Sequence, residues 1–304
     1  MLKYGKAILT EYMLNIKIRK IMNKGIALII GVGEVNTEHY DGWNGMLQQP
    51  ENDAKMIADK INKYGFTNSL LLLTQEATRQ NVIDWIQSMA LLSCPGDLVF
   101  IYYSGHGGQV PARKSDMEED NLNETWCLYD GQLIDNELYH LWAKFKAGVR
   151  IFVVSDSCHS GTITKAIIDT SDTNPVMVAK NLPDVKIKSV YSKNIDFYTE
   201  IYNKLDAEPM KNIEVPIMSF GGCQDDQCSY ALSKEKYSVF TTHFSKLLNA
   251  PLNNIPGASQ GITYDEAIKR IQLAVKEDVG LLQTPYLYQV GKDISFSDEI
   301  LLKI

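Results

Sequence analysis

The sequence LVFIYYSGHGG at residues 98–108 indicates the kind of fold that this chain adopts. Its first six residues are apolar or aromatic without a break, which is typical of a strand covered on both faces of a sheet. The run then ends in Ser104 and His106 among glycines. A second stretch, VRIFVVSDSCHSGT at residues 149–162, repeats the pattern and places Cys158 after its apolar run. Both stretches predict buried strands whose carboxyl ends carry reactive side chains.

Similar apolar runs continue the pattern along the chain at 26–32, 69–73 and 215–220. Helical periodicity lies between and after the runs, at 53–64, 78–92, 136–145, 238–248 and 264–278. This alternation predicts an α/β fold with a mainly parallel sheet that is flanked by helices on both faces. The 304 residues suit one large domain of this kind.

Three segments interrupt the pattern. Residues 109–129 are polar and acid-rich, and we expect an excursion from the third strand–helix unit there. Residues 163–212 are irregular and contain several lysines, so we expect a mobile, linker-like insertion. Residues 1–21 are expected to be an N-terminal extension or a wrongly assigned start, because Met22 reads like a second beginning. The main domain is therefore predicted to span residues 22–304.

Composition and charge exclude several functions. With 30 basic and 37 acidic side chains, the net charge of −7 argues against a chain that coats nucleic acid or an anionic membrane. No stretch approaches about 20 uncharged apolar residues, so no membrane span is predicted. Five cysteines, an odd number without framework spacing, favour a reducing compartment, and we expect a cytoplasmic location.

The sequence predicts neither a cofactor nor a metal site. Gly31 and Gly33 begin like a dinucleotide-binding fingerprint, but the third glycine position is Asn36. A phosphate-binding loop with its lysine is absent from the sequence. Cys223 and Cys228 are poorly spaced as a pair of zinc ligands, and the other cysteines lie far from them in sequence.

Cys158 and His106 form the most reactive pair in the sequence. Ligands of open α/β sheets bind beyond the carboxyl ends of the strands, where both residues are expected. An imidazole can take the proton of a thiol or stabilise the thiolate, so the pair suits nucleophilic catalysis. Each residue also has a structural interpretation: a buried cysteine packs as a small hydrophobe, and a histidine in a glycine-rich turn forms loop hydrogen bonds. His159 is a rival base, but neighbouring residues on an extended segment point to opposite sides.

The motifs around His106 and Cys158 resemble those of the caspase-like cysteine peptidases. The sequence is most similar to the metacaspases and to their bacterial relatives, the orthocaspases. The histidine and the cysteine are 158 − 106 = 52 residues apart, against about 50 in caspases. The resemblance covers Gly25 to about Ser229 and continues more weakly beyond it. The caspase signature Gln-Ala-Cys-x-Gly is not found around Cys158.

The resemblance implies a caspase-like fold and a cysteine endopeptidase mechanism. Cys158 would attack the carbonyl carbon of the cleaved bond, and His106 would transfer protons. The backbone N–H groups of Gly107 and Cys158 would bind the developing oxyanion. An acyl-enzyme would then be hydrolysed by water.

The resemblance also implies a pocket for a basic side chain. Asp156, Asp53 and Ser104 match positions that line this pocket in metacaspases, and two carboxylates suit the planar fork of arginine. The family pattern Cys-x-x-Asp reads PEND here, so Pro50 replaces its cysteine. Asp53 could also act simply as an acidic residue near a helix N-terminus. Residues 222–229 resemble a family loop that we expect to form a wall of the pocket.

Two further expectations rest on the resemblance. The calcium positions of many metacaspases fall on Asn123, Asp135, Asn136 and Lys165, where one carboxylate remains, so we predict no such site. The segment 163–212 corresponds to a linker that some family members cleave themselves. Lysines of this segment, such as Lys188 and Lys193, are either cut sites or ordinary surface residues.

The sequence therefore predicts a calcium-independent cysteine endopeptidase that cleaves protein or peptide substrates after arginine or lysine. Three alternatives remain open. The first is a latent protease of bacterial cell death or defence, which an activator of unknown identity would open. The second is a non-catalytic interaction protein on the same fold. The third is a small-molecule hydrolase with the same pair of residues.

Overall fold

The computed structural model describes residues 23–113, 116, 118, 121–158, 176–207, 212–224, 227–249, 261–291 and 294–304. Its centre is a six-stranded sheet with the order β11-β9-β7-β3-β1-β2. The strands are β1 (Gly25–Gly31), β2 (Asn68–Leu73), β3 (Leu98–Ser104), β7 (Arg150–Asp156), β9 (Ile217–Gly221) and β11 (Tyr286–Val290). All neighbours are parallel except β11, which runs antiparallel to β9.

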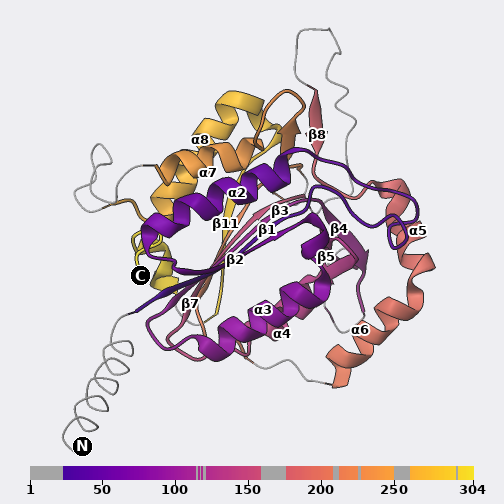
Figure 1. Ribbon diagram of the computed structural model, residues 1–304, viewed down its shortest axis with the longest axis horizontal. Helices are drawn as coiled ribbons and strands as arrows, with labels where there is room; N and C mark the ends of the chain where they lie inside the picture. Colours follow the sequence, from indigo (N-terminus) through magenta and orange to yellow (C-terminus); the bar gives the residue numbers. More distant parts are fainter. Residues whose placement is uncertain are drawn as a thin grey trace, which may run out of the picture.

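Helices cover both faces of this sheet, as Figure 1 shows. One face packs against α2 (Gln49–Ile61), α7 (Val239–Leu247) and α8 (Tyr264–Val279), and the other against α3 (Arg79–Leu92) and α4 (Asp135–Trp142). Side chains alternate along β1, so that Ala27 and Ile29 face the first layer, while Ile26 and Leu28 face the second. Strands buried on both sides explain the continuous apolar runs in the sequence.

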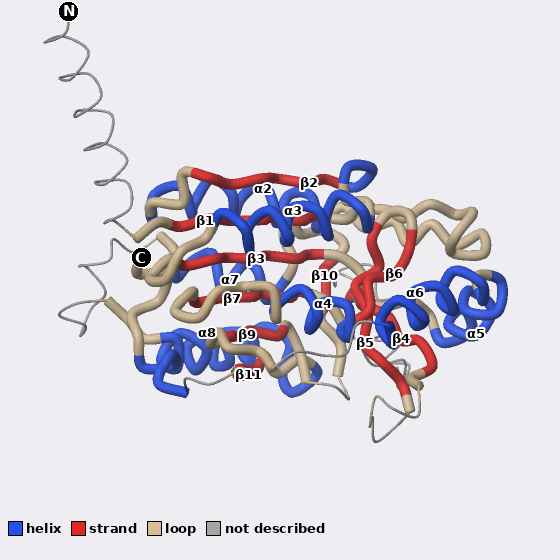
Figure 2. Tube along the Cα trace, turned by 90° about the horizontal axis from the view of Figure 1, so that it is seen from below, coloured by secondary structure: helices blue, strands red, loops and turns tan. Residues whose placement is uncertain are grey.

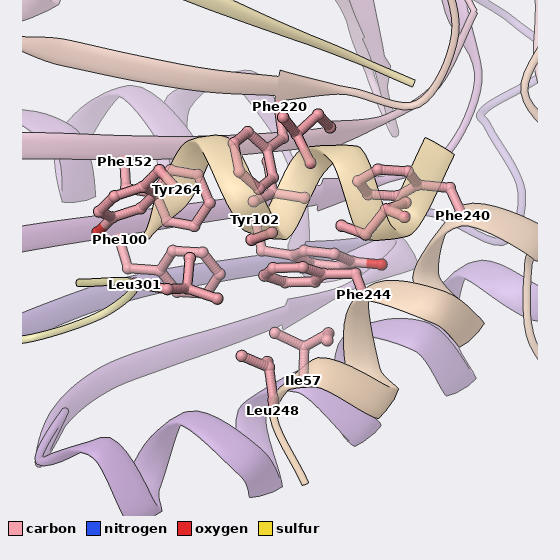
Figure 3. Packing of buried hydrophobic residues seen from close by; sticks show 14 of the residues in the cluster. Ile57, Phe100, Tyr102, Phe152, Phe220, Phe240, Phe244, Leu248, Tyr264 and Leu301 are labelled. Carbon is pink, nitrogen blue, oxygen red and sulfur yellow. The ribbon is translucent and has the colours of Figure 1, made fainter. Parts of the chain in front are cut away.

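Aromatic residues fill the core beneath α7 and α8, as Figure 3 shows. Phe152 of β7 is completely buried, and its ring lies 4.8 Å from that of Tyr264 and 4.9 Å from that of Phe220. Edge-to-face contacts of this kind add to the free energy gained by burying the rings. They fix β7, the strand that carries Cys158 at its end, against the helical layer.

The structure confirms the predicted α/β sheet and its five parallel strands. The helix predicted at 78–92 is α3, and its N-cap is Thr78, whose hydroxyl accepts a hydrogen bond from the Asn81 N–H at 3.2 Å. The edge strand β11 was not predicted. The acid-rich excursion forms a second, three-stranded sheet of β4 (Gly107–Pro111), β5 (Leu122–Leu128) and β6 (Gly131–Ile134).

The segment that the sequence predicts to be a linker contains regular structure. Its described part forms β8 (Met177–Ala179), α5 (Asp184–Lys193) and α6 (Ile195–Ala207). Strand β8 pairs antiparallel with β10 (Tyr230–Leu232). The helices lie beyond one end of the large sheet, beside the small sheet (Figure 2). The predicted extension at 1–21 lies outside the described residues.

The register of β3 and β7 sets the position of the candidate site. Ser104 pairs with Asp156 in the parallel ladder, so both strands reach the same edge of the sheet. The chain continues from β3 into β4 through His106, while Cys158 lies two residues beyond the end of β7. Two motifs that are 52 residues apart in sequence are thereby placed side by side.

We expect Phe152→Ala to lower the free energy of unfolding by about 3–5 kcal/mol, because it leaves a cavity among packed rings. Denaturant unfolding followed by circular dichroism measures this change. Leu273→Ala is the control, since Leu273 is 67% exposed on α8, and we expect a change within about 0.5 kcal/mol. Equal losses in the two variants would contradict the packing described here.

Candidate active site

His106 is held in one tautomer by the loop that follows β1. Its Nε2 lies 2.7 Å from the carbonyl oxygen of Gly45, and a carbonyl only accepts, so Nε2 carries the proton. Nδ1 makes no hydrogen bond within the described part of the chain, and the main chain of Asn181 lies beside the ring. Burial lowers the pKa of His106 to about 4. The imidazole is therefore neutral at physiological pH, with Nδ1 as its bare nitrogen.

Cys158 is fully buried at the end of β7 and lies against the main chain of Ser229. The Ser229 N–H donates to Sγ at 2.7 Å, and the thiol donates to the Ser229 carbonyl at 3.2 Å. Burial raises the pKa of the Cys158 thiol well above its usual value, and the neighbouring Cys223 thiol raises it further. Within the described residues no hydrogen bond joins Sγ to His106. The thiol is therefore protonated in this state.

Asp53 and Ser104 lie together beneath the end of the sheet. Asp53 comes from the second turn of α2 and is fully buried. Its carboxylate accepts hydrogen bonds from the Ser104 hydroxyl at 2.8 Å and from the hydroxyl and N–H of Ser238 at 2.6 and 3.0 Å. Burial raises the pKa of Asp53 to about 6, although the ammonium of Lys180 opposes this shift. Asp53 is therefore not only an acidic residue near the N-terminus of α2, because it also belongs to a buried network of hydrogen bonds.

Asp156, the last residue of β7, is the second buried carboxylate of the cluster. It accepts hydrogen bonds from the hydroxyl of Thr241 at 2.6 Å and from that of Ser229. Ser229 belongs to the loop at 222–229 that was expected to form a wall of the pocket. The structure thus brings Asp53, Ser104 and Asp156 into one buried polar cluster.

The cluster holds a residue that the sequence did not single out, Lys180. Its side chain is completely buried, and Nζ lies 3.1 Å from Asp156 Oδ1 and 3.9 Å from Asp53 Oδ2. Nζ also donates to the hydroxyls of Ser104 at 2.8 Å and Ser238 at 3.1 Å. No local sequence signal distinguishes Lys180 from the other lysines of its segment, because its partners come from four distant parts of the chain.

The main chain of Lys180 occupies the position expected for a bound substrate. Its carbonyl oxygen accepts from the N–H groups of Gly107 at 2.9 Å and Cys158 at 3.0 Å, the two donors expected to bind an oxyanion. On one side, β8 pairs with β10, and the Lys180 N–H donates to the Ser229 carbonyl at 3.0 Å. On the other side, the Leu182 N–H donates to the Gly107 carbonyl at 2.7 Å. Residues 177–182, hereafter the seated segment, thus cross the site as an extended peptide.

Other residues named from the sequence lie elsewhere. Lys188 and Lys193 are on helix α5, and His159 and Lys165 lie outside the described residues. Asn123 donates through its side chain to Asp116 at 3.0 Å. Burial and the nearby Glu124 raise the pKa of Asp135 to about 7.

The described residues contain no group of three or more histidine, cysteine, aspartate or glutamate side chains arranged to hold a metal ion. The part of the chain that the structure describes also has no helix with the length and apolar character needed to cross a membrane.

Comparison with protein families agrees with this geometry. The sequence model of the caspase domain matches residues 24–293. Metacaspase-1 of Mycosarcoma maydis is 34% identical over 155 residues, which are 47% of this chain and 37% of that protein. Metacaspase-1 of Schizosaccharomyces pombe is 34% identical over 149 residues, 44% of this chain and 33% of that protein. The matched part spans about a third of the length of either relative.

Two solved structures share the architecture. A protein of Geobacter sulfurreducens superposes with a TM-score of 0.74 and 35% identity, covering 92% of this chain and 99% of that one. Caspase-1 of Spodoptera frugiperda superposes with a TM-score of 0.53 and 11% identity, covering 89% and 93%. The insect caspase shows likeness of the fold alone.

The raised pKa predicts that the Cys158 thiol reacts slowly with alkylating agents. At pH 7.5 we expect iodoacetamide to label the exposed Cys94 about tenfold or more faster than Cys158. Peptide mass spectrometry after timed labelling measures both rates in the same sample. We expect Lys180→Gln to speed labelling of Cys158 and leave that of Cys94 unchanged. Equal rates at the two cysteines of the unaltered protein would contradict this account.

Proposed function

The chain belongs to the caspase-domain family, and from this premise we propose that it is a cysteine endopeptidase that cleaves after lysine and arginine. One observation carries the proposal. The chain's own Lys180 lies with its ammonium between Asp53 and Asp156 and with its carbonyl oxygen on two N–H groups beside Cys158. A lysine of a protein substrate would make the same contacts.

The residues support a covalent mechanism in which each transferred proton has a donor and an acceptor. Sγ of Cys158 leaves Ser229 and attacks the carbonyl carbon, while Nδ1 of His106 takes the thiol proton. The oxygen becomes negatively charged and is stabilised by the N–H groups of Gly107 and Cys158. The C–N bond then breaks, and Nδ1 gives its proton to the leaving amine. Water hydrolyses the resulting thioester, with Nδ1 again as the base.

The buried carboxylates explain the proposed preference for basic side chains. A charge is costly to bury unless a counter-ion and hydrogen bonds compensate it, so a neutral or acidic side chain would leave Asp53 and Asp156 without a cation. A guanidinium has more donors than an ammonium and suits paired carboxylates. The proposed substrates are accordingly proteins or peptides that contain arginine or lysine.

We propose that the activity does not depend on calcium. Of the positions aligned with the family's calcium ligands, Asn123 is engaged with Asp116, and Asp135 is the one that carries a carboxylate. Calcium prefers several oxygen ligands, with carboxylates raising the affinity.

The seated segment favours a second proposal, that this form of the enzyme is latent. An intact Lys180–Asn181 peptide bond lies across the site, and it must leave or be cut before another chain can enter. We therefore propose Lys180–Asn181 as a self-cleavage site. Lys188 and Lys193 are poorer candidates, because the helical backbone of α5 cannot pair as an extended strand with β10. The proposal includes an activator that releases the segment.

We expect the protein to cleave peptide reporters that end in arginine or lysine and to leave aspartate reporters intact. Cys158→Ala should abolish cleavage, and a calcium chelator should not change the rate. Asp156→Ala should lower kcat/KM on basic reporters by about 30-fold or more, because one partner of a buried charge pair is lost.

The release of a fluorophore from each reporter is measured with and without the chelator, for the unaltered protein and for each variant. Loss of cleavage on chelation would refute calcium independence, and arginine cleavage untouched by Asp156→Ala would refute the pocket. No cleavage, in the unaltered chain and also in Lys180→Gln, would favour a non-catalytic interaction protein.

Storage of the purified protein should produce a new N-terminus at Asn181. Mass spectrometry and N-terminal sequencing measure it. We expect Cys158→Ala and Lys180→Gln to remain intact, and Lys180→Arg to be cut, because arginine retains the charge. Lys188→Gln is the matched control and should be cut like the unaltered chain. A first cut after Lys188 or Lys193 would contradict the assignment.

A further inference from the structure

A buried glutamine from the C-terminal part of the chain, Gln283, supports one wall of the candidate site. It follows the short helix η3 (Gly280–Leu282) and is only 1% exposed. We propose that Gln283 is a positioning residue of the peptidase, which orients Ser229 toward both Cys158 and Asp156. This inference rests on the proposed function and adds a residue that touches neither the substrate nor the reacting atoms.

The hydrogen bonds of the Gln283 amide lead to the loop at 222–229 and to the first residue of β10. Its Nε2 donates to the Gly222 carbonyl at 2.9 Å and to the Ser229 hydroxyl at 3.1 Å. Its Oε1 accepts from the Tyr230 N–H at 3.1 Å. Because a carbonyl only accepts and a backbone N–H only donates, these partners allow one orientation of the amide. Both N–H groups of the amide are used in it.

The Gln283 amide fixes the direction of the Ser229 hydroxyl. The hydroxyl has one proton, and its oxygen accepts a hydrogen bond from Gln283. The proton is donated to Asp156 Oδ1, the oxygen that lies 3.1 Å from Lys180 Nζ. A hydrogen bond given to a carboxylate favours its charged form. Gln283 thus supports the negative charge that the pocket uses to hold a basic side chain.

The main chain of Ser229 serves the thiol and the bound peptide at once. Its N–H donates to Cys158 Sγ at 2.7 Å, and its carbonyl accepts from the Lys180 N–H at 3.0 Å. A displacement of Ser229 would therefore disturb the nucleophile, the pocket and the pairing of the peptide together. Gln283 prevents this displacement, because it binds the Ser229 side chain and also the N–H of the next residue, Tyr230.

A second glutamine holds the same two parts of the chain together from the opposite direction. Gln227 belongs to the loop at 222–229, and its Nε2 donates to the Leu281 carbonyl at 3.1 Å. Its Oε1 accepts from the Thr284 N–H at 2.6 Å. The main chain on either side of Gln283 is thereby fixed to the loop, so the amide is in place before a substrate binds.

Reporters that end in arginine or in citrulline, its neutral analogue, test the effect on the pocket. We expect Gln283→Leu to lower the ratio of kcat/KM for arginine to that for citrulline by about tenfold, because Asp156 loses the support of a directed hydroxyl. A simple loss of folded protein would lower both rates equally and leave the ratio unchanged. Gln80→Leu, the same change at an exposed glutamine of α3, is the control and should not alter the ratio. An unaltered ratio in Gln283→Leu would overturn the proposal.

The pH dependence of Gln283→Glu tests the role of the amide as a donor. An ionised carboxylate would face the Gly222 carbonyl and would draw the Ser229 proton away from Asp156. A protonated carboxyl regains one donor, and burial favours this neutral form. We therefore expect kcat/KM on the arginine reporter, divided by that of the unaltered protein at the same pH, to rise about threefold or more from pH 8 to pH 5.5. A quotient that stays constant or falls would overturn the proposal.

Hydrogen exchange of the seated segment tests Gln283 without turnover. In Cys158→Ala protein, which cannot cut itself, we expect the further change Gln283→Leu to speed exchange in residues 177–182 about tenfold, because the Lys180 N–H depends on the Ser229 carbonyl. Exchange in α3 should stay the same, which shows that the variant is folded. Unchanged exchange in 177–182 would overturn the proposal. Faster exchange there, in a protein whose unaltered form cleaves no reporter, would support the positioning role and refute the peptidase activity alone.

Discussion

The burial of two carboxylates at one end of the sheet is the constraint on which the rest of this structure depends. Asp53 and Asp156 are both fully buried, where a charge is costly without a counter-ion. Neighbouring hydroxyls satisfy part of their hydrogen-bonding capacity, and Lys180 supplies the positive charge. The carboxylates come from α2 and β7, so the pocket exists only when helix and sheet pack in this arrangement. The two carboxylates need a positive charge beside them, and this need accounts for the position of Lys180 in the seated segment.

The same sheet edge places the chemistry beside the pocket. Because β3 and β7 end in register, the N–H groups of Gly107 and Cys158 meet at one carbonyl oxygen. The seated segment covers the pair, and burial keeps the thiol protonated and the imidazole neutral. A site that is assembled but occupied by its own chain fits a latent peptidase.

Much of the fold was predictable because its signals are local. The five parallel strands are continuous apolar runs, and Thr78 caps its helix through a hydrogen bond only three residues away. The edge strand β11 was missed because its residues are only partly buried and it pairs with a strand far away in the sequence. The small sheet was missed because β4 begins with two glycines and its neighbourhood is rich in acidic residues. In the linker-like segment, β8 is three residues long and depends on pairing with β10.

The sequence by itself determined the family, the order of the five parallel strands and of the helices α2, α3, α4, α7 and α8, and the residue types at the ends of β3 and β7. These features are encoded in short motifs and in the spacing of apolar residues. Only the tertiary structure decided which nitrogen of His106 is free, since the carbonyl of Gly45 that fixes the tautomer has no side-chain signature. It alone decided that Lys180, among several lysines of one segment, enters the acidic pocket. Its contacts with α2, β3, β7 and the N-cap of α7 join residues up to 127 positions away (180 − 53), and such a set of partners exists only after the chain has folded.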